Sequence, residues 1–98
     1  MNRDRALEIL RGLQEPLAAR GIAHAAVFGS IARRDGHERS DIDVFVIPAE
    51  GARLSLFDLG GIHDILEDAF GNNVDLVISP VRNTGLRAAI GRDRADAF

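Results

Sequence analysis

Two aspartates, Asp41 and Asp43, stand two positions apart and follow the pair Gly29-Ser30 after ten intervening residues. Carboxylates this close repel each other and resist burial, so they need either solvent or a cation. If both lie on one strand, their side chains leave the same face at backbone positions roughly 6.6 Å apart. Both could then hold one Mg²⁺ or share a pair of metals. The spacing predicts a magnesium site in which Asp41 and Asp43 are metal ligands and catalytic residues.

Gly29 and Ser30 end an apolar run, at a point where a strand would pass into a helix. Backbone N–H groups at such a junction bind anions. Glycine allows the backbone to approach a phosphate closely, and the serine hydroxyl adds a donor. Arg33 follows, and its side chain would either contact the phosphates or lie on a solvated helix face. An anion site beside cation ligands predicts a metal-bound nucleoside triphosphate, with Gly29, Ser30 and Arg33 as nucleotide-binding residues.

A third aspartate lies between apolar neighbours in the later segment VDLVI, residues 74–78. Asp75 would leave the face opposite to Val74 and Leu76, and a carboxylate in such surroundings is costly without a partner. If this strand lies beside the strand of the other two aspartates, Asp75 can complete a carboxylate triad. It would then bind a second metal or take the proton from an attacking hydroxyl.

The elements that must position these residues alternate along the chain. Apolar spacing predicts a helix over about residues 3–20, in which Pro16 introduces a kink or begins a second short helix. β-Branched and apolar runs predict strands over residues 22–28, 41–47 and 74–78. Further helices are expected over residues 30–34, from a capping box at residues 55–58 to Gly71, and after Pro80 through Ile90. A polar loop is expected at residues 35–40. This order predicts an α/β fold with helices packed against a sheet.

Length and composition bound the possible functions. The chain has 98 residues, no cysteine, no lysine and a net charge of −3. A mildly acidic surface is poorly suited to long nucleic acid, because neutralising phosphates needs basic residues. The absence of cysteine is compatible with a cytoplasmic location. No apolar run approaches membrane-spanning length, and the first residues lack the apolar core of a signal peptide. We therefore expect a cytoplasmic protein with no membrane partner.

The motif G-S-x10-D-x-D, formed by Gly29, Ser30, Asp41 and Asp43, resembles the signature of a known family. It is similar to that of the minimal nucleotidyltransferases (MNT, or MntA-like antitoxins) of the DNA polymerase β superfamily. The surrounding segments AAVFGSIAR, SDIDVFV and G-x-x-VDLV are also similar to the family, so that the resemblance covers nearly the whole chain. It implies a single small nucleotidyltransferase domain over residues 1–98, with a short mixed β-sheet packed with helices.

The resemblance also implies an activity. Enzymes of this superfamily transfer a nucleoside monophosphate to a hydroxyl and release pyrophosphate, using two Mg²⁺ ions held by three acids. Carried over to this chain, the acids are Asp41, Asp43 and Asp75, with ATP as the donor. Larger relatives have a further domain for the acceptor, whereas here only one helix follows the catalytic core. We therefore expect the acceptor to come from another chain or from a second copy.

The resemblance implies that the other chain is a HEPN-domain toxin in a hetero-oligomer, and that AMP is transferred to one of its tyrosines. The sequence itself contains no tyrosine, which agrees with an acceptor in trans. Two other functions remain open. One is an antitoxin that masks the toxin sterically and binds metal or nucleotide without transfer. The other is an adenylyltransferase for a small molecule of the aminoglycoside type.

Overall fold

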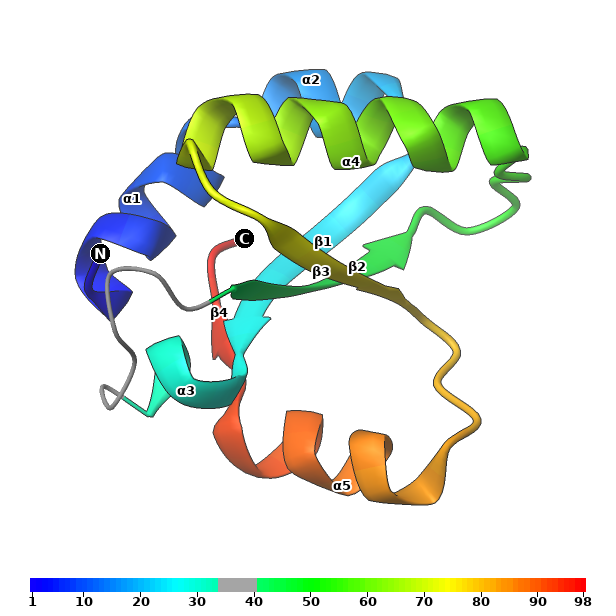
Figure 1. Ribbon diagram of the computed structural model, residues 1–98. Coiled ribbons are helices and arrows are strands. Elements are labelled where there is room, and N and C mark those ends of the chain that lie inside the picture. Colours follow the sequence, from blue (N-terminus) through cyan, green and yellow to red (C-terminus); the bar gives the residue numbers. More distant parts are fainter. Residues whose placement is uncertain (34–40) are drawn as a thin grey trace.

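The computed structural model describes residues 1–33 and 41–98, which form a mixed four-stranded sheet with helices on both faces (Figure 1). Neighbouring strands follow the order β3-β2-β1-β4. β1 pairs antiparallel with both β2 and β4, and β2 pairs parallel with β3. The bounds of the strands are Ile22–Phe28 for β1, Ile42–Pro48 for β2, Val74–Ile78 for β3 and Ala95–Asp96 for β4. The expected α/β fold with a short mixed sheet is confirmed.

Five helices lie in the described part of the chain. Their bounds are Arg3–Gly12 for α1, Gln14–Ala19 for α2, Gly29–Ala32 for α3, Leu56–Phe70 for α4 and Thr84–Asp93 for α5. Helices α1, α2 and α4 cover one face of the sheet, and α5 lies on the opposite face (Figure 1). The main core, which includes Val44 and Val46, is buried between the sheet and the helices α1, α2 and α4. A smaller cluster of Phe28, Phe45 and Ile90 packs under α5.

The alternation of side chains along β2 explains the two clusters. Val44 and Val46 are fully buried on the face of the main core, whereas Asp43 and Phe45 leave the other face. Because successive strand residues alternate in direction, a carboxylate at position 43 must lie on the α5 side of the sheet. The α5 side therefore carries both apolar and acidic groups close together.

The ends of α4 follow the sequence closely. Ser55 accepts a hydrogen bond from the Asp58 N–H, and the Asp58 carboxylate accepts from the Ser55 N–H, which is the expected capping box. The helix ends at Gly71, whose φ of 65° lies in the left-handed region. The helix runs through Gly60 without a break. The capping box and the C-terminal glycine thus fix the two ends of α4, although the glycine in its middle lowers the helix propensity there.

Three details differ from the expectations. The N-terminal helical region is two helices, one of the two outcomes expected, but the break comes at Leu13, ahead of Pro16. β2 begins at Ile42, so Asp41 directly precedes the strand. The strand β4 was not expected, because two residues carry no periodicity. The expected helix over 30–34 is present as α3 as far as Ala32, while Arg34 and the loop at 35–40 lie outside the described residues.

Across the described ranges, no helix is long and apolar enough to cross a membrane.

Candidate active site

Asp43 and Asp75 lie side by side on the parallel strands β2 and β3. The register pairs their backbone positions directly, and the Asp75 carboxyl is close enough to raise the pKa of Asp43. The two acid-bearing strands are therefore adjacent, which is the condition under which Asp75 can join the other acids.

The Asp43 carboxyl has a strongly perturbed pKa. Partial burial raises it most, and the neighbouring charge of Asp75, the hydrogen bond with Asp75 and the charge of Asp41 raise it further. The charge of Arg33 acts in the opposite direction, and the pKa is raised from 3.8 to about 6. The charge of Arg33 therefore offsets only part of the cost of placing a negative charge at Asp43. Perturbed carboxyl groups of this kind concentrate at functional sites.

Gly29 lies against the Asp43 carboxylate at the end of β1. Phe28 is paired in register with Asp43, and Gly29 follows with a φ of +71°. A Cβ atom at this position would collide with Oδ2 of Asp43 and lie 3.0 Å from its Cγ. Only glycine combines this left-handed backbone with so close an approach. The glycine of the motif is thus needed for contact with the aspartate of the motif.

Ser30 is the second residue of the short helix α3, which begins at Gly29. No side chain in the described part of the chain caps the N-terminus of α3, whose flanking residue is Phe28. The first N–H groups of a helix have no partner inside the helix. These donors lie next to the acidic pair, where phosphate oxygens bridged to a cation would accept from them.

Arg33 lies at the end of α3 and is held by Asp93 at the end of α5. The Arg33 Nη1 to Asp93 Oδ2 distance is 2.8 Å, and the Asp93 side chain is only 5% exposed. Hydrogen bonds from Arg92 and Arg33 lower the pKa of Asp93. Because Arg33 also lowers the pKa of Asp43, its guanidinium must be near the acidic pair. The ion pair therefore fixes a positive charge beside Asp43.

The donor set fits magnesium. Asp41 is exposed just ahead of β2, and across residues 1–33 and 41–98 no three His, Asp or Glu side chains are gathered as a ready metal cluster. Magnesium in phosphoryl-transfer sites is commonly bound by one or two carboxylates together with substrate phosphates. Asp43 and Asp75 supply carboxylate oxygens, Asp41 is close enough to act on the charge of Asp43, and the charge of Arg33 only partly offsets the factors that raise the pKa of Asp43. Two Mg²⁺ ions at these acids remain a prediction.

The raised pKa of Asp43 predicts a stability that depends on pH in the absence of metal. The folded-state pKa of about 6 exceeds the ordinary value of 3.8. The folded chain therefore binds the proton more tightly, and stability from this group is greatest below about pH 4 and is lost as pH rises through 6. At pH 7 in EDTA, we expect Asp43→Asn to raise the free energy of unfolding by on the order of 1 kcal/mol, since the carboxyl is partly solvated.

Urea unfolding from pH 4 to pH 7 measures this effect. The gain in Asp43→Asn should shrink toward zero at the acidic end. Asp68→Asn, which removes an exposed carboxylate from α4, is the matched control. A gain of equal size at both ends of the range would contradict the assigned pKa.

Gly29→Ala should destabilise the fold and disrupt the site together. The left-handed backbone alone costs about 1–2 kcal/mol for a residue with a Cβ atom. The collision with the Asp43 carboxylate adds to that cost. Gly51→Ala is a matched control, because Gly51 has a φ of +78° but a Cβ atom there would meet nothing within 4 Å. Urea unfolding should show a clearly larger loss for Gly29→Ala, and equal losses would contradict the close approach.

The fold and the acidic pair define a nucleotidyltransferase-type site. The family model described as "Polymerase beta, Nucleotidyltransferase" matches residues 13–94, and the chain belongs to this family. A protein of Methanocaldococcus jannaschii that carries the name protein adenylyltransferase is 40% identical over 70 residues, which cover 71% of this chain and 73% of that protein.

Solved structures agree with this assignment. A minimal nucleotidyltransferase has a TM-score of 0.70 and 32% identity, covering 97% of this chain and 95% of that chain. A chain of the complex between the tri-AMPylated Shewanella oneidensis HEPN toxin and the MNT antitoxin has a TM-score of 0.65 at 18% identity. That match covers 94% of this chain and 71% of the other, and at this identity it shows a shared fold. The resemblance to minimal nucleotidyltransferases is confirmed.

Two features near the acids were not found from the sequence. The first is Asp93, whose ion pair with Arg33 spans sixty positions along the chain and has no local signal. The second is a pair of arginines, one on α5 and one directly after it. Arg87 and Arg94 are seven positions apart, a spacing of about two helical turns, so a helical projection of the last helix could have placed them on one face.

Proposed function

We propose that this chain is a magnesium-dependent adenylyltransferase that transfers AMP from ATP to a tyrosine hydroxyl of a HEPN-domain partner toxin, and so acts as its antitoxin. The observation that carries the proposal is the contact of three groups: the paired carboxyls of Asp43 and Asp75, and the backbone of Gly29. Membership of the nucleotidyltransferase family supports the reaction class. The name of the M. jannaschii relative and the AMPylated toxin in the Shewanella complex support the acceptor class.

Different residues of the site would bind the phosphates, bind the metal ions and accept the proton. The N–H groups at the start of α3 and the Arg33 guanidinium would hold the β- and γ-phosphates. Asp41 and Asp43 would bind Mg²⁺, which supplies charge stabilisation at the α-phosphate and at the leaving oxygen. Asp75 would bind the second ion or accept the proton of the attacking hydroxyl. Their placement on adjacent strands keeps these groups in fixed mutual positions.

The chemical step is a single displacement at the α-phosphorus. The tyrosine oxygen forms a bond to this phosphorus while the bond to the bridging oxygen of the β-phosphate breaks. Pyrophosphate leaves with the bonding electrons, and the phenolic proton passes to Asp75 or to solvent. The partial burial that raises the pKa of Asp43 also lowers the local dielectric, which strengthens the interaction of this carboxylate with a cation.

Intact mass spectrometry tests the proposal. The full chain is incubated with a HEPN-domain partner, ATP and Mg²⁺, and the masses of both chains are measured. The partner is expected to gain one or more AMP units, and the 98-residue chain, which has no tyrosine, is expected to remain unmodified. Asp68→Asn should modify the partner as the wild type does, and Asp43→Asn should not. A partner that forms the complex but keeps its mass, while the wild-type chain binds ATP, would favour steric masking.

A further inference from the structure

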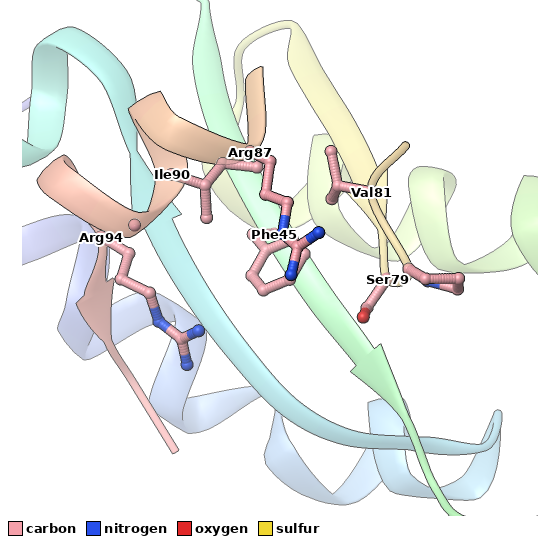
Figure 2. A pocket seen from close by; sticks show the side chains of 8 residues that line it. Phe45, Ser79, Val81, Arg87, Ile90 and Arg94 are labelled. Atoms are coloured by element: carbon pink, nitrogen blue, oxygen red, sulfur yellow. The ribbon is translucent and has the colours of Figure 1, made fainter. Parts of the chain in front are cut away.

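A pocket of about 380 Å³ opens between α5 and the sheet (Figure 2). Phe45 of β2 lies at its centre, and Ser79 and Val81 line it from the segment after β3. Arg87 of α5 and Arg94, which directly follows the helix, approach from the helix side (Figure 2). The pocket therefore combines an aromatic ring, a hydroxyl and two guanidinium groups.

The pocket lies on the same face of the sheet as the acidic pair. Phe45 and Asp43 are two positions apart on β2, so their side chains share a face about 6.6 Å apart along the strand. The same spacing occurs on the neighbouring strand β3, where Asp75 pairs with Asp43 and Val77 pairs with Phe45. The pocket therefore lies next to the acidic pair, one step further along β2 and β3 on the same face.

The direction of a bound nucleotide follows from this placement. Phe28, Asp43 and Asp75 are paired in register on three neighbouring strands, and Gly29 directly follows Phe28, so Gly29 and the two acids form a line across the sheet. If the phosphates and the attacking hydroxyl occupy that line, the ribose and base must leave it in another direction. Along β2, the pocket at Phe45 opens two positions beyond Asp43 on this face.

The side chains of the pocket suit a planar ring. The Arg94 guanidinium lies over the Phe45 ring at 5.5 Å from its centroid and is held by Asp96 at 2.9 Å. The Arg87 side chain is exposed, and it points toward Phe45 in Figure 2. Guanidinium groups stack on flat aromatic faces, and base stacking on aromatic side chains and arginine is a common mode of nucleotide binding.

We propose that this pocket binds the nucleobase and ribose of the donor nucleotide, with Arg87 and Arg94 at the faces of the base and the Ser79 hydroxyl as a polar partner. This inference rests on the proposed function, because the position of the phosphates sets the direction of the base. The positive charges of Arg87 and Arg94 also favour a nucleotide over an uncharged apolar side chain of a partner protein.

Filling the pocket tests the inference. Gly91 lines the pocket from α5, and a Cβ atom there would meet nothing within 4 Å, so Gly91→Leu adds a side chain without a backbone collision. Gly12→Leu is the matched control, since Gly12 is an exposed helical glycine on α1 with equally open space. Both substitutions replace a helical glycine by a better helix former, so that the variants should fold. Melting temperatures verify this.

The two probes are ATP and inorganic tripolyphosphate, each titrated calorimetrically in Mg²⁺. We expect Gly91→Leu to weaken ATP binding by about tenfold or more, given the usual contribution of base stacking, and to leave tripolyphosphate binding within about twofold. Arg87→Gln, which changes an exposed side chain, should weaken ATP binding by about threefold to tenfold and should also spare tripolyphosphate. Gly12→Leu should bind both probes as the wild type does.

Each other result overturns the inference. Unchanged ATP affinity in both pocket variants would show that the base lies elsewhere. Unchanged ATP affinity together with slower transfer to the partner would assign the pocket to the acceptor. Equal weakening of both probes would show that the substitutions act on the phosphate site. Failure of the wild-type chain to bind either probe in an Asp43-dependent manner would instead contradict the proposed function itself.

Discussion

Asp43→Asn is expected to reduce AMP transfer to the partner by about 10³-fold or more. Metal ions supply several kcal/mol of charge stabilisation in phosphoryl transfer, and each 1.36 kcal/mol corresponds to a factor of ten in rate. Asp43 is the acid that contacts both Gly29 and Asp75, so its amide variant removes the central carboxylate of the site. The measurement is single-turnover AMP transfer at saturating ATP, Mg²⁺ and partner.

The stability of the same variant separates chemistry from folding. Because a negative charge at Asp43 is unfavourable in the folded chain without metal, Asp43→Asn should melt at or above the temperature of the wild type at pH 7. Asp68→Asn, an exposed aspartate on α4, should retain the full rate. A stable Asp43→Asn variant that transfers AMP at the wild-type rate would remove Asp43 from the mechanism.

Asp75→Asn is expected to reduce transfer by about 10²-fold or more while ATP binding is largely retained. Asp75 lies on the edge strand β3, beside Asp43 and one strand farther from Gly29, so we expect it to act on the acceptor rather than on the phosphates. General-base assistance typically contributes about 10²–10⁴ in rate. The side chain is exposed and the amide has nearly the same volume, so packing should not change. Relief of repulsion with Asp43 should leave the melting temperature unchanged or raise it.

The comparison of binding and rate decides the role of Asp75. ATP affinity from calorimetry and the single-turnover rate are measured on the same preparations of the wild type and Asp75→Asn. Loss of rate with retained affinity supports a role at the acceptor or the second metal. A near-wild-type rate would make Asp75 a surface residue, and a parallel loss of affinity would place it in the nucleotide site.

Much of the fold could be predicted because its signals are local. The alternation in β2 and the capping box of α4 each identify an element from a few neighbouring residues. The two-residue strand β4 could not be predicted, since its pairing with Ala26 and Val27 depends on where α5 ends in space. The break at Leu13 was misplaced because Pro16 is the stronger signal, although proline is tolerated within the first turn of a helix.

The site divides in the same way. The positions of Gly29, Asp43 and Asp75 follow from spacing and strand periodicity, and the register of β2 and β3 brings the two acids together. The ion pair of Arg33 with Asp93 and the pocket at Phe45 could not be predicted in this manner. Both depend on the docking of α5 against the sheet, which joins residues far apart in the sequence.

Asp41 and Asp43 are expected to bind the nucleotide through a divalent cation beside the Gly29-Ser30 turn, and this is the central claim. Calorimetric titration of ATP into the wild-type chain and into Asp41→Asn/Asp43→Asn, each in Mg²⁺ and in EDTA, tests it most directly. We expect tight binding only for the wild type in Mg²⁺, and strongly weakened binding for the wild type in EDTA and for the folded double variant in either buffer. Equal affinity of the wild type and the folded double variant in Mg²⁺ would contradict the proposed metal site.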